Sequence, residues 1–186
     1  MLNKQRLIKS VIGLTVLSAS GLGVAATTVT GGTVHFTGTI VNAACAVSAN
    51  STNQTVNMGQ YRSAFFDAVG KKSGNVPFSI KLEDCDTTVS KKVSVSFSGL
   101  TTADNVTALS TSNIGGGSAG AASGVGIQIA DHLGQVLKPD GSVFSTAQNL
   151  VDGANVLNFS ANYISTKAVV TPGAADADAT FTMQYE

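Results

Sequence analysis

Apolar and polar residues alternate along five stretches of this chain. The last of them, residues 179–185 (ATFTMQY), shows the pattern most clearly, with Ala179, Phe181, Met183 and Tyr185 in one register. The other four are residues 76–82, 93–97, 124–130 and 157–163. Successive side chains of a strand point to opposite faces, so each stretch predicts a β-strand with one face in a core.

Residues that favour turns separate these stretches. Gly, Asp, Asn and Ser gather at residues 83–88, 99–105, 115–124, 132–141 and 151–155, which therefore read as loops. No segment keeps helical spacing beyond one or two turns, and residues 62–69 (RSAFFDAV) are the one candidate for a short helix. The pattern predicts an all-β chain, folded as a single antiparallel β-sandwich.

The first 25 residues have the layout of a secretory signal peptide. Lys4, Arg6 and Lys9 form a basic opening, followed by an uncharged, weakly apolar stretch that ends in small residues. Cleavage after Ala25 fits the preference for small residues best, and cleavage after Ala26 is the second choice. The stretch is too short and too polar for a stable membrane span, so a retained anchor is the weaker alternative.

Charge argues against two classes of partner. The chain has 11 basic and 11 acidic residues, so loss of the basic opening leaves the mature part net negative. Nucleic acid and anionic lipid are therefore poor partners.

The chain contains two cysteines, Cys45 and Cys85. Export would place them in an oxidising compartment, where a disulfide is the expected state. Closing this loop is worth about 4 kcal/mol on the chain-entropy account. The two histidines, His35 and His132, lack the spacing of a zinc site, and we expect no metal.

The sequence offers few candidate catalytic residues. No GxSxG motif is present, and His35 lies in the polar register of its segment. Asp176 and Asp178 read as a solvated turn, and GGGSAG lacks the Lys and Ser/Thr of a phosphate-binding loop. The chain has no Trp and three Tyr, which gives little aromatic surface for stacking sugars. We expect no enzyme activity and no cofactor.

The stretch TVHFTGTIVNAAC, residues 33–45, has strand alternation close to the expected N-terminus of the mature chain. One face carries Val34, Phe36, Gly38 and Ile40, and the opposite face carries His35, Thr37, Thr39 and Val41. Residues 27–41 contain no Pro and exceed the usual strand of about 5–6 residues. An unpaired apolar strand promotes aggregation, so this one needs a partner. It either folds back as a first strand or adds to the sheet of another subunit.

Four segments carry a resemblance to a known family: TVTGGTVHFTGTIVNAACAV, FSIKLEDCDT, GVGIQIADHLG and LNFSANYISTKAVVTPGAADADATFTMQYE. In this order and spacing, the chain resembles the major pilins of chaperone–usher fimbriae, and most closely the type 1 fimbrial major subunits. The resemblance covers essentially the whole mature chain and includes Gly173 and Tyr185.

The resemblance implies an incomplete immunoglobulin-like β-sandwich that lacks its last strand. A periplasmic chaperone first lends a strand to the resulting groove, and at the outer-membrane usher the N-terminal extension of the next pilin replaces it. The implied organisation is a signal peptide at residues 1–25, a donor-strand extension at 26–41 and a pilin domain at 42–186. The implied partners are identical subunits, the chaperone, the usher and tip adaptor subunits, and the implied location is the cell-surface fimbria.

The resemblance also implies roles for single residues. Val34, Phe36 and Ile40 would enter the groove of the neighbour, and Gly38 would lie over a shallow part of it; alternatively, Gly38 marks a bulge in an internal strand. Gly173, Phe181, Met183 and Tyr185 would line the acceptor groove, the chaperone contact or the adjoining core. A minor or adaptor pilin, and a monomeric secreted carbohydrate-binding sandwich, are the alternative functions.

Overall fold

The computed structural model describes residues 26–112, 114 and 120–186. The expected signal peptide, residues 1–25, lies outside the described residues. The chain divides into two units, Met1–Thr39 and Ile40–Glu186. The described part of the first unit, residues 26–39, contains no assigned helix or strand. All strands of the described residues belong to the second unit.

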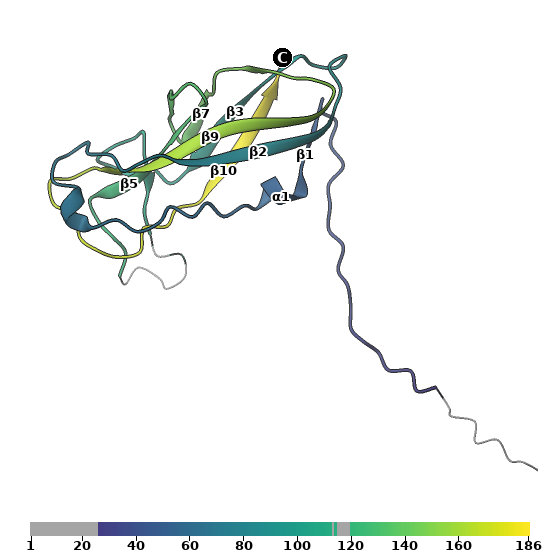
Figure 1. The fold of residues 1–186 in the computed structure, drawn as a ribbon, viewed down its shortest axis with the longest axis horizontal. Helices are drawn as coiled ribbons and strands as arrows, with labels where there is room; N and C mark the ends of the chain where they lie inside the picture. Colours follow the sequence, from purple (N-terminus) through teal and green to yellow (C-terminus); the bar gives the residue numbers. More distant parts are fainter. Residues whose placement is uncertain (1–25, 113, 115–119) are drawn as a thin grey trace, which may run out of the picture. The chain divides into compact units, whose positions relative to one another are not determined.

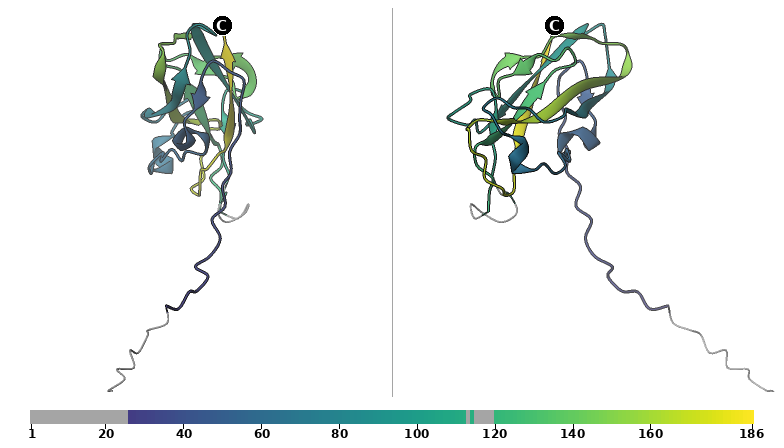
Figure 2. Two further views of the ribbon diagram at one scale, coloured as in Figure 1. Left: turned by 90° about the vertical axis from the view of Figure 1, so that its right-hand side faces the viewer. Right: turned by 60° about the vertical axis from the view of Figure 1, so that its left-hand side comes forward.

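The second unit is a sandwich of two antiparallel sheets (Figures 1 and 2). In the first sheet the strand order is β1 (Ala46–Val47), β2 (Val76–Cys85), β9 (Gly153–Ser165), β5 (Val125–Ala130) and β4 (Leu109–Ser110), with β6 (Val136–Leu137) also paired to β5. In the second sheet the order is β10 (Ala179–Tyr185), β3 (Lys92–Gly99) and β7 (Asp140–Phe144), with β8 (Gln148–Asn149) also paired to β3. The predicted antiparallel sandwich is confirmed.

The five predicted strands correspond to β2, β3, β5, β9 and β10. Their apolar registers form the core between the sheets, with Ile80 and Val95 fully buried. Phe78, Phe97 and Phe159 meet there, with ring centroids 5.2 to 6.1 Å apart. The period-two pattern identified these strands correctly because each places one face against this core.

Two of the strands are buried on both faces, which the alternation did not predict. In β5, the side chain of Gln128 is buried on the outer face and its amide donates to Thr107 Oγ1 at 2.6 Å. A Cβ on Gly126 would lie 2.8 Å from the carbonyl oxygen of Leu109 and 3.0 Å from Ala108 Cβ. The loop before β4 therefore covers β5 from outside. In β3, Ser94 and Ser96 are likewise buried.

Helix in the described residues is limited to α1 (Ala49–Thr52) and the 3₁₀ turn η1 (Ser63–Phe65). The candidate helix at residues 62–69 is thus reduced to η1, after which Phe66 enters the core with 5% exposure. The sequence analysis did not predict α1. It follows β1 and begins a long irregular connection to β2.

The expected disulfide joins Cys45 to Cys85 and is confirmed. Both cysteines are buried. The bond connects the residue just before β1 to the last residue of β2, and the N–H of Asp86 donates to the carbonyl of Ala44 at 2.9 Å. These two links hold the first residues of the sandwich at one end of the first sheet.

The disulfide generates a stability prediction. Replacing both residues, Cys45→Ala with Cys85→Ala, should lower the free energy of unfolding by about 4 kcal/mol, because the unfolded chain regains the freedom of the open loop. Urea unfolding followed by circular dichroism measures the change. The unsubstituted chain under reducing conditions is the control and should match the double variant. An unchanged urea midpoint in both would contradict the prediction.

Candidate functional site

The N-terminal segment presents a row of apolar side chains to solvent. Val34, Phe36 and Ile40 are 73%, 89% and 100% exposed, and every residue from 26 to 43 is exposed. No strand is assigned there, so the segment is not an added first strand of this chain's own sheets. Exposed apolar side chains at alternate positions are the mark of a surface that binds a partner.

Strand β10 is an edge of the second sheet. It pairs with β3 over all seven residues, from Ala179↔Gly99 to Tyr185↔Val93, and the described residues place no strand along its other edge. As predicted, Phe181, Met183 and Tyr185 point to the core, while Thr180, Thr182 and Gln184 are exposed. The outer edge of β10 therefore offers backbone N–H and C=O groups to an incoming strand.

An irregular segment, residues 53–61, faces β10 across the opening between the sheets. Within the described residues no backbone–backbone hydrogen bond involves this segment, and one N–H, that of Gly59, is bound by Asn57 Oδ1 at 2.9 Å. Val56 and Met58 are half-buried, the residues beside them are exposed, and no helix or strand is assigned to the segment. It supplies a second row of backbone groups without a protein partner.

A groove with a volume of about 1090 Å³ runs between residues 53–61 and the start of β10. Core residues form its floor: Phe78, Phe97, Leu109, Ile127, Ile129, Ala161 and Tyr163. A further hollow of about 410 Å³ continues it, sharing Gly59, Tyr163, Ala175 and Asp176 with the main groove. The side of the core that a last strand would cover is open.

Half-buried apolar residues line this opening. They contact the core and remain partly in water: Val47, Met58, Phe78, Ala122, Val170, Ala175, Ala177 and Phe181. An apolar strand laid in the groove would remove these side chains from water and meet free backbone groups on both sides.

The groove is closed at the end nearest the disulfide. There the Tyr185 hydroxyl donates to the carbonyl of Cys45 at 3.3 Å, which joins β10 to the residue before β1. Burial raises the pKa of Tyr185 above its usual value. Met183 and Tyr185 cover the core at this end and do not line the groove, whereas Phe181 does.

Aromatic residues surround the opposite end of the groove. Tyr61 and Tyr163 meet edge to face with ring centroids 5.7 Å apart, and Phe66 lies 6.3 Å from Tyr61. The Tyr163 hydroxyl donates to the carbonyl of Ala175 at 3.0 Å. Burial raises the pKa of Tyr163, and the nearby Asp176 carboxylate and Tyr61 raise it further. This hydroxyl fixes the position of the groove wall.

Gly173 lies in the same wall and is required by close backbone packing. A Cβ there would lie 2.5 Å from backbone atoms of Ala121 and Ala122 and would also strike the carbonyl oxygen of Gly120. The Ala122 N–H donates to the Ala174 carbonyl at 2.7 Å. Any side chain at position 173 would therefore push the two segments apart.

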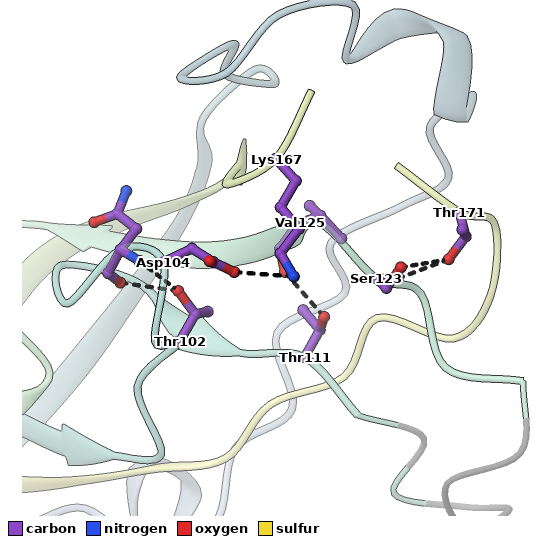
Figure 3. A network of polar contacts seen from close by, with 8 residues as sticks. Thr102, Asp104, Thr111, Ser123, Val125, Lys167 and Thr171 are labelled. Atoms are coloured by element: carbon purple, nitrogen blue, oxygen red, sulfur yellow. Dashed lines mark hydrogen bonds and ion pairs between the residues drawn. The ribbon is translucent and has the colours of Figure 1, made fainter. Parts of the chain in front are cut away.

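Hydrogen bonds join this wall to the segment before β5 (Figure 3). The hydroxyls of Ser123 and Thr171 lie 2.8 Å apart, and the Ser123 N–H donates to Thr171 Oγ1 at 3.1 Å. The wall that carries Gly173 is thus bound to the segment before β5.

The other candidate catalytic and metal-binding residues form no common site among the described residues. His35 and His132 are exposed and belong to different units. Asp176 and Asp178 are exposed on the groove wall. In the part of the chain that the structure describes, no group of three His, Cys, Asp or Glu could hold a metal, and no helix is long and apolar enough to cross a membrane.

The sequence analysis missed the wall at residues 53–61 and the aromatic end formed with Tyr61. The one signal for the wall was the pair Val56 and Met58, two residues apart within a polar stretch. A pair is too short to distinguish a strand-like segment from a loop.

Comparison with known proteins identifies the family of this chain. Residues 34–186 match the family model of the fimbrial proteins. The chain is 52% identical to the Fimbrial subunit type 1 of Salmonella typhimurium over 158 residues, which cover 85% of this chain and 84% of that protein.

Two solved structures are similar over most of their length. A chaperone–usher pilus structure that describes rod uncoiling is 30% identical, with a TM-score of 0.69, covering 87% of this chain and 100% of its own. The P pilus rod subunit PapA is 29% identical, with a TM-score of 0.65, covering 77% and 100%. The sandwich is therefore the immunoglobulin-like fold of these subunits. The chain belongs to the fimbrial protein family, and it is a structural subunit of a surface fimbria.

Proposed function

We propose that this chain is a rod subunit that polymerises by donating a strand to the next copy. Residues 26–41 of one copy would fill the groove of its neighbour, while its own groove receives the same segment from a third copy. The observation that carries the proposal is the presence, in one chain, of an open apolar groove and of a matching exposed apolar row.

The side chains of the donor segment suit the groove. Val34, Phe36 and Ile40 share one face and would contact the apolar floor, which includes Phe78 and Ile127. Transfer of each such side chain from water to an apolar site is worth about 1.5–3 kcal/mol, before the cost of ordering the segment. The opposite face, with His35, Thr37 and Thr39, would stay at the surface.

The backbone of the donor segment would find partners on both sides. On one side lies the free edge of β10, and on the other lie residues 53–61. Backbone bonds of this kind supply affinity in strand addition, and the alternate side chains select the register.

An open groove is a liability before assembly, because it exposes the core and an unpaired edge. We propose that a periplasmic chaperone covers it first and that the outer-membrane usher then exchanges the chaperone for the next subunit, with tip adaptor subunits above the rod. The similarity of this chain to a subunit of a chaperone–usher pilus supports these partners. The function needs no catalytic residue, and we assign none.

Gly38 supplies the sharpest test of the register. Gly38→Arg should abolish polymerisation of the purified mature chain, because a long charged side chain would enter the apolar groove. Thr37→Arg is the matched control, since it adds the same side chain on the opposite face and should leave polymerisation within about twofold. Negative-stain microscopy and sedimentation measure the outcome. Rods of normal length from the Gly38 variant would refute the register.

A free peptide tests the groove itself. A peptide of residues 27–41, added at about 100 times its Kd, should stabilise the purified mature chain by about 2.7 kcal/mol, because it binds the folded state alone. The same peptide carrying Phe36→Asp is the control and should bind at least about 100-fold more weakly, because it would bury an unpaired charge. Thermal unfolding gives both values. Equal effects of the two peptides would show that the groove is not the binding site.

A further inference from the structure

The connection between the donor segment and its own sandwich is very short. Val41 is exposed, whereas Ala44 is buried and held by the N–H of Asp86 at 2.9 Å. Three residue steps separate Val41 from Ala44 and span about 10 Å at most. On the proposed function, on which this inference rests, the sandwich of the donating copy must therefore touch the end of the groove from which its segment emerges.

That part of the donating sandwich carries a group of acidic residues, which we name the acidic end. Glu83 pairs with Ala46 in the ladder of β1 and β2, and Asp86 binds Ala44. Thr87 donates to the Asp152 carboxylate through its N–H at 2.8 Å and its hydroxyl at 2.6 Å, which brings Asp152 to the same place. The acidic end consists of the exposed residues Glu83, Asp84, Asp86 and Asp152. Lys91 and Lys92 stand at the start of β3 in the other sheet, beside Glu186.

The opposite end of the first sheet carries basic residues, which we name the basic end. It consists of Arg62, Lys71 and Lys72, all exposed. Two exposed carboxylates lie there as well: Asp67 beside Lys71, and Asp176 in the hollow lined by Tyr61 and Tyr163. Arg62 follows the groove residue Tyr61, and Lys72 is bridged to Ile164, beside the groove residue Tyr163.

The ten residues of β2, at about 3.3 Å each, separate the two ends by roughly 30 Å. The Lys71 Nζ atom lies 3.7 Å from Asp67 Oδ1 and over the ring of Phe65. The three ion pairs found within the described residues involve Lys71, Lys138 and Lys167, so Arg62 and Lys72 take part in none of them.

The direction of the inserted segment decides which ends meet. Strand β10 runs toward the acidic end, where Tyr185 binds Cys45. A donor segment parallel to β10 would emerge there and bring two acidic ends together. A segment antiparallel to β10 would emerge beside Tyr61 and bring the acidic end of one copy to the basic end of the next. Opposite charges favour the second arrangement, and like charges oppose the first.

We propose that neighbouring copies dock end to end through these charges, with Glu83 and Asp84 of one copy facing Arg62 and Lys72 of the next. The contact joins two different surfaces of the same chain, so it repeats without closing and suits a filament. It steers each incoming copy to the open end of the groove and then holds the joint between successive sandwiches. The free peptide of residues 27–41 lacks the acidic end, so these charges add nothing to its affinity for the groove.

The test follows polymerisation of the purified mature chain by light scattering in 20 mM and 500 mM NaCl. Reversing the basic end with Arg62→Glu and Lys72→Glu should slow polymerisation about tenfold at low salt, and changing the acidic end with Glu83→Lys and Asp84→Asn should do the same. The chain with all four substitutions should recover most of the lost rate, because the ammonium group introduced at position 83 then faces the carboxylates introduced at positions 62 and 72. In 500 mM NaCl all variants should polymerise at similar rates, since salt screens exposed charges.

Lys81→Glu is the matched control for charge reversal, because Lys81 is exposed and lies outside the basic end. It stands two residues before Glu83, so the substitution leaves the acidic end acidic. This variant should polymerise no more slowly than the unsubstituted chain. The peptide of residues 27–41 should bind the basic-end variant with unchanged affinity, which shows that fold and groove are intact.

Three results would overturn the inference. The basic-end variant could polymerise no more slowly than Lys81→Glu, the four substitutions together could fail to rescue, or peptide binding could fall with polymerisation. In the first two cases, intact peptide binding would leave the proposed function standing. If the unsubstituted chain did not bind the peptide, the proposed function itself would be refuted.

Discussion

The unpaired edge of β10 is the constraint on which the rest of the structure depends. A strand at the edge of a sheet leaves half of its backbone groups without protein partners, and here the core beside it is also uncovered. Water satisfies the backbone groups but not the apolar floor. On the proposed function, the donor segment of another copy covers this floor, so joining a copy lowers the free energy of the subunit.

Specific contacts hold both ends of the groove. The disulfide and the bond from Tyr185 to Cys45 hold one end, while Tyr163 and the packing at Gly173 hold the other. A groove that collapsed onto its floor would bury the apolar residues within the subunit and remove the reason to polymerise. The wall that carries Gly173 is bonded to the segment before β5, whereas the wall at residues 53–61 packs on the core through Met58 and makes no backbone–backbone hydrogen bond among the described residues.

The distribution of charge complements the apolar groove. The donor segment contains no acidic or basic residue apart from His35, and the groove floor contains none. Acidic residues gather around the disulfide, and Arg62, Lys71 and Lys72 lie around Tyr61, while Asp176 and Asp178 stand on the groove wall. Apolar contact and backbone bonds would supply the strength of each joint, whereas charge would supply approach and orientation. The two tasks fall to different residues and are separable by substitution.

The sequence by itself determined the features that depend on neighbouring residues. Five strands, the inward register of Phe181, Met183 and Tyr185, the cysteine pair and the apolar row at Val34, Phe36 and Ile40 all follow from spacing within short segments. The tertiary structure alone decided the second wall at residues 53–61, the tight packing at Gly173, the covered outer face of β5 and the separation of charge into two ends. Each of these needs segments that lie far apart in the chain to meet in space. Periodicity reports the face of a strand that turns to a core, but it carries no information about which distant backbone will approach it.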